Sequence, residues 1–399
     1  MKLRGLVVVV SLVLSLAGFG VSQTLGFKHV IIIVQENRTP DNLFGKAGVQ
    51  GADVMVNTQF GKGVDIGGPQ GAIHTHAQFL LQASGGKIHR DAYNYVVSGA
   101  DPYWAMAKQY GFANRMFQTN QGPSFPSHQF LISGTSAPDD VSDLFMSENL
   151  TQGSPGCRNN PANLVAALAP DGTISMVSTC FDRASLMDLL DEAGLTWRYY
   201  AAAGKTFWSA PVSLKKYYKS KNLVMNPPQI LTDIAGNTLA NVSWVTPGLL
   251  YSDHPGGSTG GPAWVASIVN AVGASPYWQD TAIIVTWDDW GGEWDHVPPL
   301  PNNTGWCQIY CYGYRVPLLV ISTLTPPGYV DNDIHDYGSI LRFVESNFSL
   351  STIGDGGWAD SFADDLSAFF TTKARQFVPI QSRRLTKRES MDTTEPDDD

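Results

Sequence analysis

The fold is decided by the run HVIIIVQ, residues His29–Gln35, which leads directly into the acidic residue Glu36. Continuous β-branched apolar residues are typical of a strand that is buried on both faces of a parallel sheet. The runs Ala282–Trp287 (AIIVTW) and Val316–Ser322 (VPLLVIS) have the same character. Two weaker strand candidates are Ile174–Thr179 and Thr196–Ala201.

Helical patterns lie between these strands. Ser185 and Asp188 form the pattern of a capping box, and Gly194 ends the same helix. Helical apolar spacing also covers Pro262–Val272 and Asp336–Phe348. Because strands alternate with helices, we expect an α/β fold: a three-layer α/β/α sandwich with a mostly parallel central sheet.

The remaining segments are interpreted around this core. The Gly-, Asn- and Pro-rich stretches Gly45–Gly71 and Trp208–Gly261 are predicted to be insertions over a sheet edge. One catalytic domain is expected over residues 23–380. Residues 381–399 are rich in charge and poor in apolar side chains, so we predict a disordered tail there.

The N-terminus has the pattern of a secretory signal. Lys2 and Arg4 precede the apolar run Leu6–Phe19, and the small residues Gly20 and Ser22 follow. We predict that residues 1–22 are a signal peptide and that the protein is secreted, either to the extracellular space or to the periplasm. A signal anchor that stays in the membrane is the alternative, but the run is short for a stable membrane span.

The cysteines agree with export. There are four in the chain, and an even count in an oxidising compartment predicts two disulfides. Pairing of nearest neighbours, Cys157 with Cys180 and Cys307 with Cys311, is our choice among three connectivities. A zinc site is the alternative, although the spacing contains no CxxC pair.

Charge and composition restrict the partners. The 399 residues carry a formal net charge of −10, and no basic stretch tracks along the chain. We therefore expect no nucleic-acid partner. Hydrophobic residues make up 43% of the chain, which is enough for a sizeable core.

Acidic and amide side chains follow two of the predicted strands. Glu36 and Asn37 follow the first run, and Asp288 and Asp289 follow AIIVTW. Ligands of open parallel sheets gather beyond the carboxyl ends of the strands. Adjacent buried carboxylates repel each other unless a cation holds them, and their oxygen atoms suit a hard cation. The alternative for each stretch is a polar turn.

A serine loop lies between these two strands in the chain. Ser124 stands in GPSFPSH, where its hydroxyl is predicted to open a helix over Ser127–Ile132. A helix N-terminus favours phosphate anions, and a nearby metal activates a hydroxyl as a nucleophile. The alternative makes both serines simple helix caps.

Histidines are the candidates for proton transfer, because their pKa lies near neutrality. The chain has eight. His74 and His76 lie in AIHTHAQF, and His254 lies in a Pro/Gly-rich loop without an obvious structural purpose. His128 in the serine loop and His296 after the acidic loop are supporting candidates.

Taken together, these motifs resemble a known family. ENRTPDNLFG, the GGK of Gly85–Lys87, GPSFPSH, DHPGGS and WDDWGGEWDHVPP follow one another in that family's order. The chain resembles, over about residues 28 to 350, the secreted phosphoesterases that include bacterial-type phospholipases C and acid phosphatases. The resemblance implies an alkaline-phosphatase-like core.

The resemblance also implies roles for particular residues. Metal ligands are implied at Glu36, Asn37, Asp288 and Asp289, and Ser124 falls where the family has its metal-bound nucleophile. His74 and His254 match histidines that line the phosphate pocket, with His76 as the substitute for His74. Phospholipase C members usually have Thr in a GPTxPNR motif, so GPSFPSH does not predict phosphatidylcholine as the substrate.

The expected function is therefore metal-dependent hydrolysis of phosphate esters through a phosphoseryl intermediate. The expected substrate is a small phosphate ester or a phospholipid head group. The expected cofactor is one divalent cation, with Ca²⁺, Mg²⁺ or Mn²⁺ favoured over Zn²⁺ because the predicted protein ligands are oxygen atoms. A Ser-His-Asp esterase needs G-x-S-x-G, which Ser124 lacks. A carbohydrate-binding protein, suggested by 11 Trp and 15 Tyr, leaves the acidic strand ends unexplained.

Overall fold

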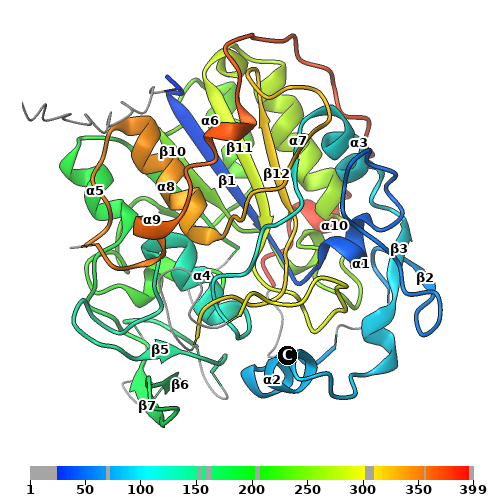
Figure 1. Cartoon of the computed structure of the whole chain (residues 1–399). Coiled ribbons are helices and arrows are strands. Elements are labelled where there is room, and N and C mark those ends of the chain that lie inside the picture. Colours follow the sequence, from blue (N-terminus) through cyan, green and yellow to red (C-terminus); the bar gives the residue numbers. More distant parts are fainter. Residues whose placement is uncertain are drawn as a thin grey trace, which may run out of the picture.

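The computed structural model describes residues 25–68, 72–150, 154–158, 163–202, 207–301, 310–354 and 356–394. Its main feature is an eight-stranded sheet with helices on both faces (Figure 1). The strands lie in the order β13 (Tyr329–Asp331), β4 (Gly111–Ala113), β12 (Leu318–Ser322), β11 (Thr281–Trp287), β1 (His29–Gln35), β10 (Val242–Val245), β8 (Trp197–Tyr200) and β9 (Leu223–Val224).

The sheet is mostly parallel, as the alternation of strands and helices predicts. β12 is antiparallel to both of its neighbours, and the other paired strands run in the same direction. The run Val316–Ser322 is therefore a buried strand, but the expectation that it is parallel is wrong. A run of apolar residues shows burial on two faces and carries no information on direction, which explains the error.

Helices pack in two groups, one on each side of the sheet (Figure 1). One group contains α4 (Ser124–Ser133), α5 (Leu186–Glu192), α8 (Tyr337–Phe348) and α9 (Ala359–Phe362). The other contains α3 (Asp101–Gln109), α6 (Gln229–Ala235) and α7 (Gly261–Gly273). The predicted three-layer architecture is confirmed, and so is the capping box of Ser185 and Asp188 at the start of α5.

Smaller elements lie outside the three layers. The remaining α-helices are α1 (Pro40–Phe44), α2 (His76–Ala83) and α10 (Lys387–Ser390), and the 3-10 helices are η1 (Arg90–Tyr93), η2 (Ala210–Ser213), η3 (Leu249–Tyr251), η4 (Pro276–Gln279) and η5 (Ser367–Phe369). A two-stranded sheet holds β2 (Gly63–Asp65) and β3 (Tyr95–Ser98), and a three-stranded sheet holds β5 (Phe145–Met146), β6 (Leu164–Leu168) and β7 (Ile174–Ser178).

Two expectations about segments are corrected. The predicted strand Ile174–Thr179 exists as β7, but it belongs to the small antiparallel sheet and is largely exposed. The stretch Trp208–Gly261 is not an insertion over a sheet edge, because β10 lies within it and pairs directly with β1 in the middle of the sheet. β10 is only four residues long, VSWV, and this short run is obscured by its Gly- and Asn-rich surroundings.

The C-terminal segment also differs from its prediction of disorder. Residues 381–394 have a defined course, and the segment packs on the body of the protein. Arg383 pairs with Glu389 at 2.6 Å, and Leu385 packs against the main core. Composition alone does not reveal this order, because the contacts that hold the segment are made with distant parts of the chain.

The disulfide prediction is confirmed for one pair, since Cys157 and Cys180 are bonded. Cys311 is disulfide-bonded as well, and its predicted partner Cys307 lies outside the described residues. The predicted signal peptide, residues 1–22, also lies outside them. Among the described residues, no helix is both long enough and apolar enough to cross a lipid bilayer.

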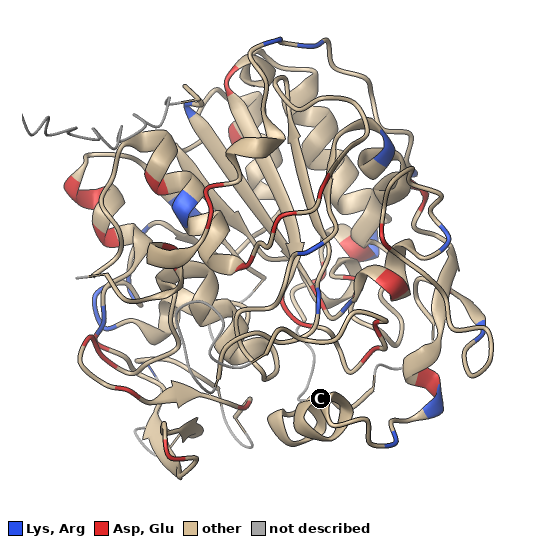
Figure 2. Ribbon diagram, in the orientation of Figure 1, with Lys and Arg blue, Asp and Glu red and all other residues tan. Residues whose placement is uncertain are grey.

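The register of the two central strands positions the site. Gln35, the last residue of β1, pairs with Trp287, the last residue of β11. The two strands are parallel and end at the same level, so the residues that follow them emerge side by side. Figure 2 shows acidic segments where the central strands end, while the strands themselves carry almost no charge.

Candidate active site

The core of the site is formed by the two strand ends. Glu36, Asn37, Asp288 and Asp289 are all buried, with exposed fractions of 1% or less. The backbone N–H of Asn37 donates to Asp288 Oδ1 at 3.1 Å, and the N–H of Asp289 donates to the same oxygen at 2.8 Å. These hydrogen bonds hold the two polar segments against each other, as the sequence predicts.

Tight backbone turns allow this close approach. Asn37 has a φ of 58°, and Gly291 has a φ of 62° in the loop after Asp289. A Cβ atom at Gly291 would lie 2.7 Å from the carbonyl oxygen of Asn37. Gly291 also donates its N–H to Asp289 Oδ1 at 2.7 Å. Gly291 is therefore required here for two reasons: it adopts a positive φ without strain, and it has no Cβ atom to clash with Asn37.

Ser124 reaches the same place from the helical layer. It is the first residue of α4, and its Oγ donates to Asp289 Oδ2 at 3.1 Å. Ser127 has a different role, because its Oγ donates to the carbonyl of Pro123 at 3.1 Å and accepts from Asn120 Nδ2 at 2.9 Å. Ser127 thus fixes the turn that presents Ser124 to the acidic strand ends.

The start of α4 offers less to an anion than the sequence pattern predicts. The N–H of Phe125 donates to Asn149 Oδ1 at 2.9 Å, and Pro126 has no N–H. Two of the first N–H positions of the helix are therefore not available to a phosphate group. The anion-binding argument for this helix is weakened, whereas the contact between Ser124 and Asp289 does not depend on it.

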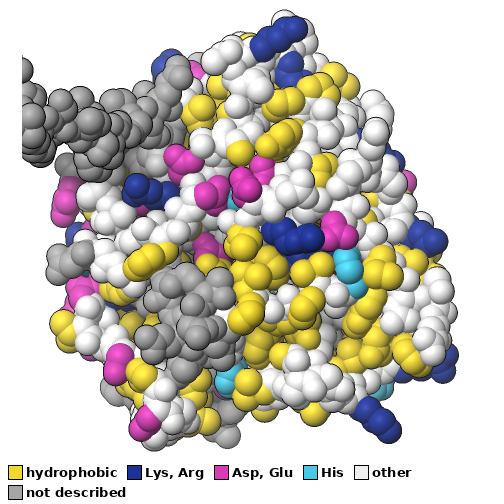
Figure 3. All heavy atoms as spheres, viewed as in Figure 1, with side chains coloured by type: hydrophobic (Ala, Val, Ile, Leu, Met, Phe, Trp, Pro, Cys, Tyr) yellow, Lys and Arg dark blue, Asp and Glu magenta, His cyan; other side chains and the backbone are white. Residues whose placement is uncertain are grey.

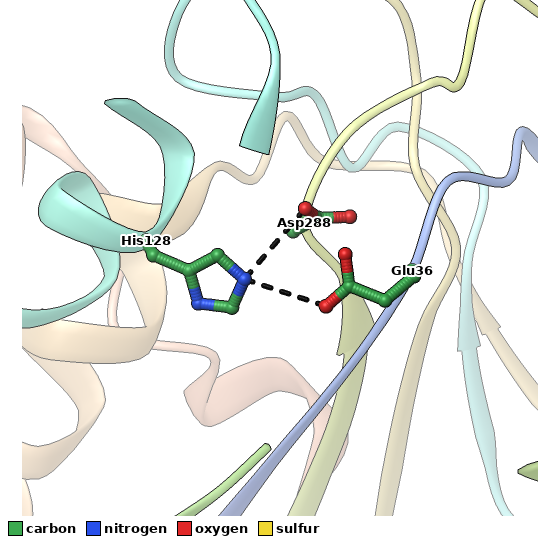
Figure 4. A group of neighbouring side chains, drawn as sticks. All are labelled: Glu36, His128 and Asp288. Carbon is green, nitrogen blue, oxygen red and sulfur yellow. Dashed lines mark ion pairs between the residues drawn. The ribbon is translucent and has the colours of Figure 1, made fainter. Parts of the chain in front are cut away.

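His128 lies one helical turn after Ser124 and on the same face of α4. Figure 4 shows its imidazole pointing between the carboxylates of Glu36 and Asp288. His128 Nε2 lies 3.4 Å from Glu36 Oε1 and 3.6 Å from Asp288 Oδ2. Burial lowers the pKa of His128 to about 4, against the opposing effect of Asp288, so the ring is neutral at pH 7.

These side chains fit a divalent cation. Glu36, His128 and Asp288 each offer a ligand atom, and the three atoms lie within 4.8 Å of one another. Asp288 Oδ2 is buried and makes no hydrogen bond within the described residues. Carboxylates gathered around a neutral imidazole repel one another unless a positive charge lies between them. The preference for hard ions over Zn²⁺ was based on oxygen ligands alone. His128 adds a nitrogen ligand, so that preference no longer follows.

One histidine contacts the acidic group directly, and a second lies in a segment that is hydrogen-bonded to it. His74 Nε2 lies 3.7 Å from Asp289 Oδ2 and 3.3 Å from Asn37 Nδ2. His254 lies two residues after Ser252, whose carbonyl accepts from the N–H of Glu36 at 2.8 Å. His74 Nδ1 lies 3.0 Å from the carbonyl of Ala72, and His254 Nδ1 lies 2.9 Å from the carbonyl of Pro255.

The carbonyl partners define the tautomers of these histidines. A carbonyl oxygen only accepts, so Nδ1 must carry the hydrogen in each ring. Nε2 then carries the lone pair of the uncharged ring and is the atom to which a proton adds. His74 and His254 therefore share the same tautomer, with Nδ1 held by a backbone carbonyl in each case.

The other candidate histidines make their contacts elsewhere. His76 begins α2, and its Nδ1 lies 2.9 Å from the carbonyl of Gln121, beside the serine loop. His296 Nδ1 lies 2.8 Å from Asp41 Oδ2, and its Nε2 lies 3.1 Å from Asp53 Oδ1. His76 supports the loop that holds Ser124, while His296 belongs to a separate cluster.

That separate cluster contains its own positive charge. Asp41, Asp295 and His296 form a second group of metal-ligand type. Arg315 is fully buried beside it, and its Nε donates to Asp295 Oδ1 at 2.9 Å while its Nη2 donates to Asp295 Oδ2 at 3.1 Å. The guanidinium pairs with both carboxylates, so we assign the cluster a structural role.

Asp253 is a residue of the site that motif reasoning did not single out. It is fully buried with a φ of 75°, and its Oδ2 accepts from Tyr103 Oη at 2.6 Å and from Trp287 Nε1 at 3.1 Å. Its carbonyl accepts from two nitrogens of Arg38. Burial raises the pKa of Asp253 to about 6. Asp253 thus fastens the segment that carries His254 to the end of β11. The sequence signal for its role is its position directly before that histidine.

Comparisons with known proteins show the family of this chain. The phosphoesterase family matches residues 91–351, and the chain belongs to that family. A hemolytic phospholipase C of Pseudomonas aeruginosa is 24% identical over 425 residues, which cover 86% of this chain and 56% of the relative. A non-hemolytic phospholipase C of the same organism is 25% identical over 416 residues, which cover 86% and 57%. The chain thus spans a little over half the length of these relatives.

A solved structure of a protein in the alkaline phosphatase superfamily, from Vibrio parahaemolyticus, aligns with 87% of this chain and 71% of its own. The TM-score is 0.42 and the sequence identity is 12%. The family assignment rests on the family match and the sequence relatives, and the architecture is seen directly in the sheet.

Proposed function

We propose that this protein is a secreted, metal-dependent phosphoesterase that hydrolyses phosphate esters through a phosphoseryl intermediate on Ser124. The observation that carries the proposal is the contact between Ser124 Oγ and Asp289 Oδ2 at 3.1 Å, beside the group of Glu36, His128 and Asp288. A serine hydroxyl is a weak nucleophile until a base or a cation activates it, and this arrangement provides for both.

The residues that would hold the cation are those at the strand ends and on α4. They are Glu36, Asn37, Ser124, His128, Asp288 and Asp289. A bound divalent cation supplies Lewis-acid polarisation of a phosphoryl oxygen and lowers the pKa of a neighbouring hydroxyl.

The protein's own groups carry out the proton and group transfers. Ser124 Oγ attacks phosphorus and forms a new O–P bond, while its proton passes to Asp289 Oδ2, to which it already donates. The bond between phosphorus and the leaving oxygen breaks, and that oxygen takes a proton from Nε2 of His254 or His74, which enters this step as a doubly protonated imidazolium. Water then attacks the phosphoserine and gives a proton to the same histidine. The bond between phosphorus and Ser124 Oγ breaks, Oγ takes back the proton held by Asp289, and phosphate is released.

The surface around the site bears on the substrate class. The relatives named above are phospholipases C, and Figure 3 shows hydrophobic side chains gathered over the half of this face that contains α1 and α2. Leu80 and Leu81 of α2 and Ile73 just before it are exposed. An apolar surface beside the site suits a lipid substrate, whereas a soluble phosphate ester needs no such surface.

A substrate panel with a chelator tests the proposed function. We expect the purified protein to release product from at least one member of a panel of phosphomonoesters, phosphodiesters and phospholipid vesicles. A divalent-ion chelator will abolish turnover, because the buried carboxylates then lack the charge that organises them, and added Ca²⁺, Mg²⁺, Mn²⁺ or Zn²⁺ will restore it. Turnover that persists after the chelator has removed all bound metal would contradict the proposal.

Secretion is proposed from the N-terminal sequence pattern, and residues 23–380 are proposed as the catalytic domain. We expect export to remove residues 1–22, so that the mature chain begins near Gln23. N-terminal sequencing of the protein recovered outside the cytoplasm measures this. Exported protein that still begins at Met1 would refute the cleavage.

A further inference from the structure

The C-terminal segment is hydrogen-bonded to the loop that carries His254. We call residues 381–394 the C-terminal strap and residues 249–259 the histidine loop. In Figure 1, the orange-to-red chain runs over the top of the molecule and down its right side to α10. The sequence predicts disorder here, yet the strap makes specific hydrogen bonds to both ends of the histidine loop.

At the start of the histidine loop, two backbone donors find partners on the strap. The N–H of Leu249 donates to the carbonyl of Thr394 at 2.9 Å, and the N–H of Leu250 donates to Asp392 Oδ2 at 2.7 Å. Close approach is possible because residue 248 is a glycine: a Cβ atom at Gly248 would lie 2.4 Å from the carbonyl oxygen of Asp392.

At the end of the histidine loop, the two residues of the strap's ion pair contact Thr259. Arg383 Nη2 donates to the carbonyl of Thr259 at 2.9 Å, and Thr259 Oγ1 donates to Glu389 Oε1 at 3.4 Å. Arg383 and Glu389 pair at 2.6 Å, and Thr386 forms a capping box with Glu389. The strap is thus fixed within itself at the point where it touches the loop.

Inside the histidine loop, further hydrogen bonds lead to the site. Ser258 Oγ accepts from the N–H groups of Ser252 at 3.1 Å and Asp253 at 2.9 Å. The N–H of His254 donates to Ser252 Oγ at 3.1 Å, and the carbonyl of Ser252 accepts from the N–H of Glu36 at 2.8 Å. A continuous set of contacts therefore joins the strap to His254 and to a strand end of the acidic group.

We propose that the C-terminal strap is a positioning element that holds the histidine loop, and with it His254, in the geometry needed for catalysis. Asp392 and Arg383 are the positioning residues, and neither contacts the acidic group itself in the described structure. The proposal rests on the proposed function of His254 as a proton donor, because only then does a displaced loop slow the reaction.

The test uses two pairs of variants of the full chain. Asp392→Ala removes the acceptors for both Leu250 and Thr394, whereas Asp392→Asn keeps an oxygen that accepts from the N–H of Leu250 and serves as the control for the loop contact. Arg383→Ala removes the contact with Thr259. Arg384→Ala removes the same charge one residue later, where the side chain is exposed and makes no ion pair within the described residues. Hydrogen–deuterium exchange of residues 249–259, kcat, KM and metal content are measured for each.

We expect Asp392→Ala and Arg383→Ala to raise exchange in the histidine loop and to lower kcat about tenfold, with metal content unchanged, since small displacements of a catalytic group cost large factors in rate. Asp392→Asn and Arg384→Ala should behave like the wild type. A merely structural strap would lower the unfolding temperature and leave kcat unchanged well below it. That result would overturn the proposal, as would unchanged exchange in both alanine variants. Wild-type protein that hydrolyses no phosphate ester would instead refute the proposed function, while the exchange result still decides whether the strap holds the loop.

Discussion

We expect Ser124→Ala to lower kcat by about 10³-fold or more on any phosphate ester that the wild type hydrolyses. The change removes the attacking oxygen and its hydrogen bond to Asp289 Oδ2, and it leaves the helix intact because alanine is a good helix former. Steady-state kinetics on the purified variant measure the loss. Circular dichroism and the unfolding temperature establish that the fold is retained.

Two further substitutions control this experiment. Ser133 is buried at the other end of α4 and its Oγ makes no hydrogen bond within the described residues, so Ser133→Ala should leave kcat unchanged. Ser124→Thr keeps a hydroxyl, and we expect it to retain part of the activity, because the phospholipase C members of the resembled family use threonine there. If Ser124→Ala keeps most of its turnover while a His254 variant loses it, an activated water is the attacking group and the covalent mechanism is wrong.

The second large effect concerns the metal. We expect Asp288→Asn to lower affinity for the divalent cation by at least about 100-fold and to lower activity with it. Asp288 Oδ1 accepts from the N–H groups of Asn37 and Asp289, and an asparagine oxygen preserves both hydrogen bonds. Its amide nitrogen then replaces Oδ2, which faces Glu36 and His128, so a negative ligand becomes an uncharged hydrogen-bond donor.

Asp280 provides a matched control at the opposite end of the same strand. It directly precedes β11, where it pairs with Lys28 at 2.9 Å, far along the strand from the acidic group. Asp280→Asn should therefore leave both metal content and kcat unchanged. Elemental analysis of the dialysed proteins together with kinetics measures the two quantities. Full metal content and full turnover in Asp288→Asn would exclude this site.

The acidic strand ends could be predicted from the sequence because each depends on a local pattern. A β-branched run predicts a buried strand, and an acid directly after it must lie at the carboxyl edge of the sheet. The sequence does not show which strands are neighbours. The pairing of Gln35 with Trp287, which brings Glu36 beside Asp288, follows from the fold as a whole.

His128 shows where local reasoning was incomplete. It was a supporting candidate, and the structure places its Nε2 between Glu36 and Asp288. Its spacing of four residues from Ser124 was a usable signal, since residues four apart share one face of a helix. The signal depends on a helix that begins at Ser124 itself, whereas the sequence pattern indicated regular helix only from Ser127.

The C-terminal segment shows a different limit. Charge and low hydrophobicity predict disorder because such a segment buries too little apolar surface to fold by itself. The segment is nevertheless ordered against the rest of the protein, where Asp392 and Arg383 satisfy backbone groups of the histidine loop. Those partners lie more than 100 residues away in the chain, and no local pattern reveals them.

The central claim is that a covalent phosphoseryl intermediate forms on Ser124, and the stereochemical course of hydrolysis tests it most directly. A phosphate ester made chiral at phosphorus with oxygen isotopes is hydrolysed by the wild-type protein, and the configuration of the product is determined. Two successive displacements at phosphorus, first by Ser124 and then by water, predict net retention. Net inversion would show a single direct attack by water and would contradict the account.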